Sequence, residues 1–429
     1  MKASFEAQGN VLFLKFEQDQ DEYFQEEHRI NMDRTMMELR LPKEWSAGDI
    51  HKDHLALITI LSIHPFVSKL LEIDWSVSQD FAIEVQNSCS YNITFASTSE
   101  APYVAEKGHP CLAFSGGVDS TAALLLMPKN TLCAWLDRPD LGKRTLYNKT
   151  AAKHTMEFTR AQGYSVHEIY CDVEHLRSPV GFPVDLSSGI AAIAIASHTN
   201  GNSIAYGMIM EAAYRTGHTK YRNYIESNHF KSWDKCFAKA GIPLFLPVSG
   251  VSEVGTSTIV KNSVFDGNAR SCIRGDWPEQ CDNCWKCFRK TLVDYRIMNK
   301  PIGNEEMEMW MKVREVKFKL SAWPVSHENV LAWALKNPKV SEGISTLLLE
   351  RLEGSQRDLH LLSKWYPPAL ELIPDSEKEL FLQTIREYLH EMSQSEILET
   401  EALDLRPWLE AEKAHLAREL FEKGMSNLV

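Results

Sequence analysis

Residues 111–121 read CLAFSGGVDST, and this stretch decides the fold. An apolar run over 111–114 meets two glycines, and a helical run follows over 121–127. A strand, a glycine-rich turn and a helix in this order bring free backbone N–H groups and the positive end of a helix dipole to one point. The stretch therefore predicts a phosphate-binding site at residues 115–120.

The side chains of the turn narrow the chemistry. Hydroxyls of Ser115 and Ser120 flank the two glycines, and Asp119 can bind Mg²⁺, cap the helix, or do both. The turn lacks the Gly-Lys-Ser/Thr end of a Walker loop, which argues against a kinase or a GTPase. The chain has no Gly-x-Gly-x-x-Gly that would indicate a dinucleotide site. An ordinary strand–helix connection is the alternative reading of a Gly-Gly turn.

Four of the nine cysteines cluster in a second motif. Cys272, Cys281, Cys284 and Cys287 follow the spacing Cys-x8-Cys-x2-Cys-x2-Cys. Four thiolates at short, turn-compatible spacings fit a structural Zn²⁺ site with no open position for a catalytic water. An Fe–S cluster is an alternative, since four cysteines also hold one. Reduced or disulfide-bonded cysteines are another, although two bridges in so short a segment would be cramped.

Composition limits the class of protein. The chain has 429 residues, 44% of them hydrophobic, and a net charge of −12. The negative charge argues against non-specific nucleic-acid binding, although Lys286, Arg289 and Lys290 could form a local basic patch. The N-terminus has no apolar signal segment, and no run approaches the roughly twenty apolar residues of a membrane span. We therefore expect a cytoplasmic, reduced protein with no membrane partner.

The pattern of elements divides the chain into three predicted domains. Residues 1–100 read as a small α+β domain. Its predicted elements are strands at 11–16, 37–41, 81–85 and 91–95 and a helix at 53–71. Residues 301–429 read as an all-helical domain. Its predicted helices are 305–320, 326–336, 341–352, 376–392 and 408–424. The tryptophans and methionines there are interpreted as core packing; they are Trp310, Met311, Trp323, Trp333 and Trp365.

Between them, residues 101–300 alternate strand and helix. The predicted strands are 110–114, 132–136, 165–170, 203–207 and 244–247, and the predicted helices are 147–162, 189–198 and 233–240. This rhythm predicts a parallel sheet with helices on both faces. Ligands of such sheets lie beyond the carboxyl ends of the strands. The loops after Phe114, Leu136, Gly207 and Pro247 should therefore line one cleft.

The phosphate motif and the cysteine motif together resemble the 7-cyano-7-deazaguanine synthase (QueC-like) family of PP-loop ATP pyrophosphatases. The resemblance covers residues 109–295 and implies a parallel-sheet, HUP-like core. It implies ATP-dependent adenylation of a 7-deazaguanine carboxylate or amide with release of pyrophosphate. Cofactors would be ATP, Mg²⁺ and a structural Zn²⁺ on the four cysteines. Nucleotide would bind at Phe114, Ser115, Gly116, Gly117, Val118, Asp119, Ser120 and Thr121, with Asp119, Ser115 and Ser120 as the catalytic set.

The sequence departs from that family where the substrate should bind. The family's Pro-x-Arg-Asn corresponds to residues 183–186, Pro-Val-Asp-Leu, so an acid replaces a base. Gly207 is kept, but the later Asp of the segment is an alanine. The family's usual cysteine-containing substrate segment is replaced by residues 221–228. Gly207 and Glu211 are the predicted substrate contacts, although Glu211 could equally stabilise a helix N-terminus.

Two further segments could reach phosphates. Arg138, Lys143 and Arg144 follow the second strand of the predicted sheet and could equally be a solvated loop. Residues 252–258 look like a capped helix start whose N–H groups could add to the phosphate site.

The added N- and C-terminal regions resemble those of extended family members in bacterial anti-phage systems. That likeness implies a protein acceptor or a defence-complex partner for the activated base. Two alternatives stay open. One is a tRNA-modifying PP-loop enzyme, which the acidic charge disfavours. The other is a non-catalytic, nucleotide-binding scaffold of a defence complex, against which the intact Asp119 and loop serines weigh.

Overall fold

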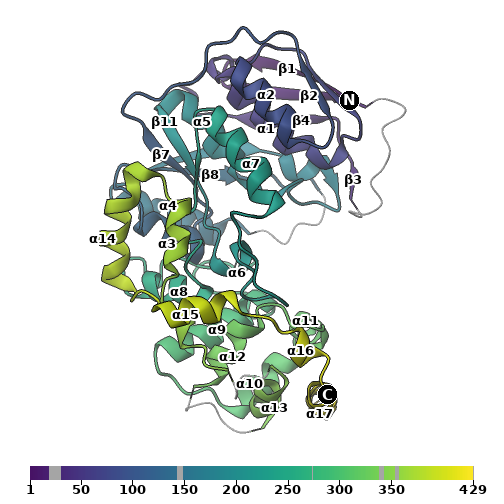
Figure 1. The fold of residues 1–429 in the computed structure, drawn as a ribbon, viewed down its shortest axis with the longest axis vertical. Helices are drawn as coiled ribbons and strands as arrows, with labels where there is room; N and C mark the ends of the chain where they lie inside the picture. The colour runs from purple at the N-terminus through teal and green to yellow at the C-terminus, as the bar shows by residue number, and fades with distance from the viewer. Residues whose placement is uncertain (19–29, 143–147, 273, 338–342, 353–356, 429) are drawn as a thin grey trace.

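A computed structural model describes residues 1–429 except 19–29, 143–147, 273, 338–342, 353–356 and 429. The described chain is a mixed α/β structure with one ten-stranded, mostly parallel sheet. Figure 1 shows this sheet in the upper part of the molecule and the helices that follow residue 253 mostly below it. None of the helices in the described ranges is long and apolar enough to cross a membrane.

Five parallel strands form the half of the sheet that carries the phosphate motif. In spatial order they are β12 (Leu244–Phe245), β11 (Gly201–Ala205), β7 (His109–Ala113), β8 (Leu132–Asp137) and β9 (Ser165–Cys171). All five agree with predicted strands. Helix α5 (Ile190–Thr199) packs on them and is buried from Ile190 to Ala196, as expected for a helix that is apolar all round. Two further helices correspond to predicted ones. They are α4 (Thr150–Ala161) and α7 (Asn228–Lys239).

The N-terminal strands continue the same sheet. They are β1 (Lys2–Gln8), β2 (Val11–Glu17), β4 (Met36–Arg40), β5 (Leu70–Ile73) and β6 (Asn92–Phe95). Strand β4 joins β9 antiparallel, with Leu39 opposite Cys171 and Arg40 opposite Tyr170. A separate two-stranded sheet pairs β3 (Asn31–Met32) with β10 (Arg177–Ser178). Residues 1–100 thus share their sheet with the strands that follow.

Two predictions in the N-terminal region are wrong. Residues 81–85 are not a strand but part of helix α2 (Gln79–Ser88). Phe81 and Val85 are buried while Ile83, which a strand would place on the same face, is 53% exposed. The predicted helix at 53–71 ends early as α1 (Lys52–Ile63), because Pro65 follows, and its last residues belong to β5.

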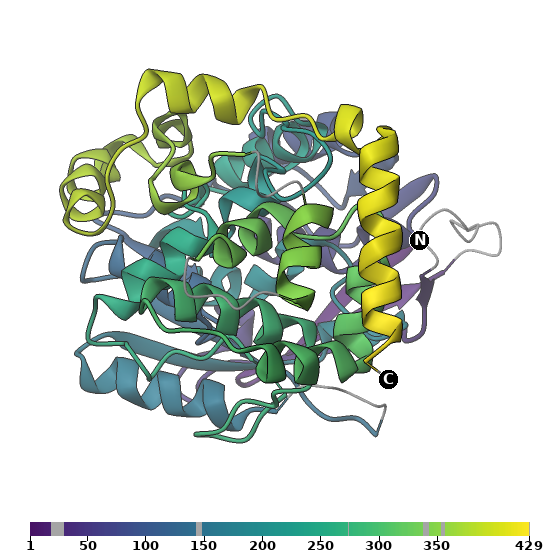
Figure 2. The same ribbon diagram turned by 90° about the horizontal axis from the view of Figure 1, so that it is seen from below.

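Helices make up the described chain beyond residue 303, and no strand is found in the part of this region that the structure describes. They are α10 (Asn304–Lys312), α11 (Arg314–Ser321), α12 (Glu328–Leu335), α13 (Ile344–Arg351), α14 (Lys378–Tyr388), α15 (Gln394–Glu401), α16 (Arg406–Leu409) and α17 (Glu412–Ser426). The predicted helix 305–320 is divided at Val313, and α15 was not predicted. Figure 2 shows α17, in yellow, along one side of this end.

The tryptophans of this region pack in the interior. Trp310, Trp333 and Trp365 are each less than 9% exposed, and Met311 is buried with them. Their interpretation as core residues is therefore confirmed, and Trp323 is half-buried.

Candidate nucleotide and metal site

The predicted phosphate turn connects β7 to helix α3 (Val118–Leu125). Gly116 has φ +73°, a backbone conformation that favours glycine. A Cβ at this position would also lie 3.2 Å from the Cβ of Thr155 on α4. The turn is therefore tight because both its own dihedral angles and a neighbouring helix leave no room for a side chain.

The hydroxyls of the two serines of the turn form a hydrogen bond with each other. Ser115 Oγ and Ser120 Oγ are 3.0 Å apart, and Ser115 Oγ also accepts a hydrogen bond from the N–H of Gly117 at 3.3 Å. Ser120 Oγ donates to the carbonyl of Gly117 at 3.1 Å. Thr121 N–H donates to the same carbonyl at 2.9 Å as the helix begins. These hydroxyls fix the shape of the turn, and Ser115 remains exposed beside the cavity described below.

Gly207 lies against the start of α3, although it is far from the turn in sequence. A Cβ on Gly207 would lie 2.9 Å from the backbone nitrogen of Ser120. Backbone cannot give way as a flexible side chain can, so this position requires glycine. The structure thus brings Gly207 and the phosphate turn together.

Side chains from two helices hold the carboxylate of Asp119 in place. Its Oδ1 accepts a hydrogen bond from Thr256 Oγ1 at 2.8 Å and lies 3.3 Å from Lys290 Nζ. Thr256 belongs to α8 (Glu253–Lys261), and Lys290 belongs to α9 (Trp285–Ile297). Burial by itself raises the pKa of Asp119, but the charges of Lys290 and Lys286 outweigh it and lower the pKa. The carboxylate is therefore held ionised beside the turn.

Helix α8 is the capped helix predicted at 252–258. Ser252 Oγ accepts hydrogen bonds from the N–H groups of Val254 and Gly255, both at 3.1 Å. These N–H groups are therefore already used by the cap. The helix contributes to the site through the side chain of Thr256 instead. No motif or spacing in the sequence singles out Thr256.

Lys290 connects Asp119 to a buried group of charged side chains around Glu253. Glu253, fully buried, accepts from Arg289 Nε at 2.7 Å and lies 3.3 Å from Lys290 Nζ and 3.5 Å from His327 Nδ1. Burial by itself raises the pKa of Glu253, but Lys290 and Arg289 outweigh it and hold the pKa well below its ordinary value. Burial, with the charge of Arg289, lowers the pKa of His327 to about 4. The group thus consists of a neutral His327 imidazole and the ionised Glu253, which pairs with Arg289 and Lys290.

Glu211 belongs to this buried group. It begins the short helix α6 (Met210–Ala213), is 1% exposed, and accepts the N–H of Glu253 at 3.0 Å. Burial, with repulsion from Glu253, raises its pKa to about 8. Glu211 is not among the described residues that line the cavity beside Ser115 and Asp119. The structure therefore places this predicted substrate contact behind the site rather than on its surface.

The basic residues near the cysteines do not form a surface patch. Arg289 and Lys290 are 7% and 5% exposed and pair with Glu253 and Asp119. Lys286, one helical turn before Lys290, lines the cavity beside the phosphate turn. The local basic patch that these residues could have formed is therefore not found on the surface, because Arg289 and Lys290 face buried carboxylates.

A cavity of about 320 Å³ opens at the carboxyl ends of the strands. One part of its wall is polar and includes Ser115, Gly117, Asp119, Ser120 and Lys286. The other is largely apolar and is formed by Phe114, Trp135, Leu136, Phe182, Tyr206 and Met208. The cavity therefore offers an anion-binding end and a surface against which a flat ring could pack.

The loops after Phe114, Leu136 and Gly207 reach this cavity as predicted, whereas the loop after Pro247 does not line its described wall. That chain segment instead leads to α8 below Asp119. Arg138 lines the cavity and pairs with Glu174 at 2.9 Å. Lys143 and Arg144 lie outside the described residues.

Two of the three segments that depart from the family pattern, 183–186 and 221–228, lie in different parts of the structure. Asp185 and Ser188, from the segment around 183–188, line the cavity. Residues 221–228 do not line its described wall; there, Tyr221 Oη lies 2.9 Å from Tyr366 Oη, near the C-terminal helices. Asp185, the acid that stands where the family has a base, thus faces the cavity.

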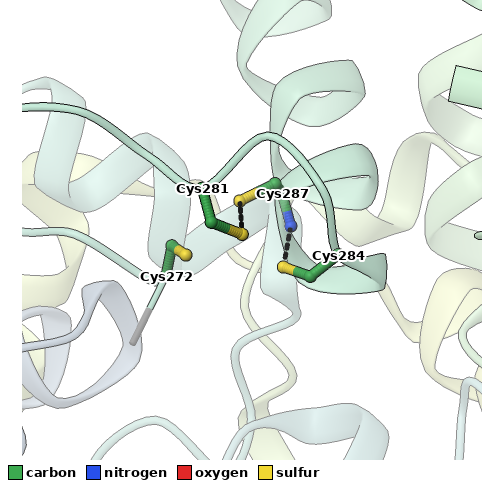
Figure 3. Close-up of side chains that lie close together, drawn as sticks. All are labelled: Cys272, Cys281, Cys284 and Cys287. Carbon is green, nitrogen blue, oxygen red and sulfur yellow. Dashed lines mark hydrogen bonds between the residues drawn. The ribbon is translucent and has the colours of Figure 1, made fainter. Parts of the chain in front are cut away.

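The four predicted cysteines come together at the start of α9 (Figure 3). Their sulfurs all lie within 4.8 Å of one another, with Cys281 Sγ 3.7 Å from Cys287 Sγ. A tetrahedral ion with Zn–S bonds of about 2.3 Å separates its sulfurs by about 3.8 Å, so the arrangement fits one zinc-sized ion. The cysteines can hold a metal such as zinc.

Helix α9 carries both halves of the site. Cys284 caps its N-terminus by accepting the N–H of Cys287 at 3.3 Å. Lys286 and Lys290 follow on the same helix. The position of the two lysines beside Asp119 therefore depends on the segment that the cysteines fold. Two lysines four residues apart, one between the last two cysteines and one three residues after Cys287, were the sequence signal for this link.

Comparison with known proteins gives one match. Residues 232–404 match the model of a family described as a family of unknown function (DUF6395). The matched segment contains the four cysteines, α8 and α9, and begins after the phosphate turn. No curated protein and no solved structure matched the chain.

Proposed function

We propose that this protein is a QueC-like PP-loop enzyme that uses ATP to activate a carboxylate or amide of a 7-deazaguanine-type base. The observation that carries the proposal is the single cavity in which the glycine turn, Asp119 and Lys286 lie next to an apolar wall. The polar end suits the phosphates of ATP, and the apolar end suits planar rings. Both parts of the reaction would then share one cavity.

In the first step, a carboxylate oxygen of the base attacks the α-phosphorus of ATP. The bond from that phosphorus to the oxygen bridging the β-phosphorus breaks, and pyrophosphate leaves with the electron pair. An acyl adenylate remains. An amine then attacks its carbonyl carbon and loses a proton, and AMP leaves with the electrons of the C–O bond. The product is an amide.

With ammonia as the amine, the resulting amide can be activated a second time. Its oxygen attacks a second α-phosphorus, pyrophosphate leaves, and loss of AMP together with the two amide protons gives the nitrile. With an amine of a partner protein, the base instead becomes joined to that protein. The N- and C-terminal regions that extend beyond the family resemblance support a protein acceptor, within an anti-phage defence complex.

The roles of the chain follow from its contacts. The N–H groups of Gly116 and Val118 in the turn and the ammonium of Lys286 would stabilise the charge that develops on departing pyrophosphate. Ser115 and Ser120 hold the turn in shape. Asp119, a half-buried carboxylate beside this turn, is the residue that fits Mg²⁺, which neutralises phosphate charge when bound. Asp185 and Ser188 would contact the base.

The test is pyrophosphate release from ATP with 7-carboxy-7-deazaguanine as substrate, with mass spectrometry of the products. Wild-type protein should release pyrophosphate only when the base is present, and Asp119→Ala should lower that rate at least about a hundredfold. Asp80→Ala, an exposed acid on α2 paired only with exposed Lys239, should retain the wild-type rate.

The products separate the proposal from its rivals. AMP together with an amide, a nitrile or a protein adduct supports it. Release of pyrophosphate only with tRNA would point to a tRNA-modifying enzyme instead. ATP binding without pyrophosphate release under all of these conditions would indicate a nucleotide-binding scaffold.

A further inference from the structure

A second cavity, of about 150 Å³, lies among the C-terminal helices. Its wall comes from Thr216 after α6, Asn329 on α12, the segment 357–362, the end of α15 and the segment 403–405. None of the described residues lines both cavities. A cavity of about this volume in another protein holds a benzene ring, so there is room for a small molecule.

Polar atoms without partners surround this cavity. Asn329 Nδ2 and Thr216 Oγ1 have no hydrogen-bond partner among the described residues, and these two side chains are 0% and 1% exposed. A buried polar group left unpaired destabilises the folded protein. Both residues line the cavity, so a ligand there could supply acceptors that the protein does not.

Arg357 adds a fixed cation to the same wall. Its Nη2 donates to Glu328 Oε1 and to the carbonyl of Leu352, both at 2.9 Å. Its Nε and Nη1 are buried and have no partner among the described residues. The guanidinium is thus anchored at one nitrogen and keeps donor groups for something else.

The remaining wall has the opposite character. Asp358 and Glu399 are exposed residues that line the cavity, and leucines of segments 359–362 and 403–405 supply an apolar surface. The pKa of Glu399 is raised by burial and by the charges of Asp358 and Glu396. Buried donors therefore line one side of the cavity, and the carboxylates of Asp358 and Glu399 stand at its exposed side.

The contrast between the buried donors and the exposed carboxylates limits which ligands fit the cavity. A simple anion would satisfy Arg357 and Asn329 but would meet the carboxylates of Asp358 and Glu399. A simple cation would pair with those carboxylates but would leave the buried donors unpaired. A molecule with a carboxylate at one end and an ammonium at the other satisfies both sides without adding net charge.

We propose that this cavity binds a free amino acid. Its carboxylate accepts from Arg357, Asn329 and Thr216, its ammonium pairs with Asp358 and Glu399, and its side chain packs on the leucines. All but Thr216 and Leu405 of the residues that line this cavity fall within residues 232–404, the segment matched by the family of unknown function. The proposal does not depend on adenylation at the first cavity.

The test is binding of the twenty free L-amino acids to the full chain, by thermal shift and calorimetry. At least one should raise the melting temperature and bind. The deaminated acid and the decarboxylated amine of that amino acid should each bind at least tenfold more weakly. Binding of either fragment as tightly as the amino acid, or binding of none of the twenty, would overturn the proposal.

Variants locate the site. Leu403→Trp fills the cavity and should abolish binding, whereas Leu398→Trp, on the neighbouring exposed surface of α15 at 57% exposure, should bind as wild type. The melting temperatures without ligand show whether either variant is folded. Asn329→Asp, nearly the same size but repelling a carboxylate, should weaken binding at least tenfold. Unchanged binding in Leu403→Trp and Asn329→Asp would place the ligand elsewhere. Asp119→Ala should keep full binding, which separates this result from the test of adenylation.

Discussion

The phosphate turn and the cysteine cluster are neighbours that are held in different ways. The turn is fixed by packing and backbone: Gly116 fits against α4, Gly207 fits against Ser120, and Ser115 bonds to Ser120. The cysteine cluster consists of four sulfurs drawn from a segment with little regular structure before α9. The first is a product of the whole fold, whereas the second has the arrangement that a metal ion could hold together. The difference predicts which changes each will survive.

Loss of the metal should have the largest effect. Cys287→Ser removes one of four ligands, so we expect loss of bound metal and a drop in the free energy of unfolding of more than about 4 kcal/mol. Lys286 and Lys290 lie on the helix that the cluster begins, so pyrophosphate release should fall as well. Metal analysis with denaturant unfolding measures both.

Cys89→Ser, a half-buried cysteine outside the cluster, is the matched control and should keep its metal. Full metal content in Cys287→Ser would show that the four sulfurs do not act together. Zinc in the wild-type protein fits the proposed site, and iron with visible absorption would indicate an Fe–S cluster.

The buried charges come next. Glu253→Gln leaves Arg289 and Lys290 without their shared carboxylate, and breaking such a buried set costs about 3–5 kcal/mol. The exposed Glu305→Gln should change the free energy of unfolding by less than about 0.5 kcal/mol. Denaturant melts at pH 7 compare the two. Equal stability of the two variants would mean that the buried ions contribute nothing beyond surface charge.

Glu211 should give the protein a pH dependence. Its pKa is about 8 in the folded protein, above the ordinary 4.5, so the folded state binds this proton more tightly. The stabilisation is complete below about pH 4.5 and is lost as the pH rises through about 8. Between pH 5 and 9 its loss should reach about 4 kcal/mol, and Glu211→Gln should remove that slope. Unfolding measured across this range decides it; the same slope in both proteins would assign it to other groups.

The smallest expected change is at the turn itself. Gly207→Ala places a methyl group against the backbone of Ser120, which we expect to cost about 1–3 kcal/mol. The metal should remain bound, because the clash does not reach the cysteines. Gly303→Ala, where a Cβ meets nothing within 4 Å, is the control. A Gly207→Ala protein that lost its metal would show that the two sites are not held independently.

The sequence predicted those parts of the site that are contiguous in it. The turn at 115–120 and the four cysteines each lie in one short segment, and the five parallel strands could be located from their apolar runs. The partners of Asp119 could not, because Thr256 and Lys290 lie 137 and 171 residues away. Helix α2 was missed because Phe81, Ile83 and Val85 fit a strand period, and only burial shows that Ile83 faces outward. Spacing along the chain says little about which distant charges meet.

The pairing of β4 with β9 has a consequence for the solubility of the protein. Without residues 1–100, β9 would be the last strand of the parallel set, and its outer N–H and C=O groups would have no partner. An open edge of this kind recruits strands from other chains and leads to aggregation. The N-terminal strands therefore protect the five parallel strands from self-association.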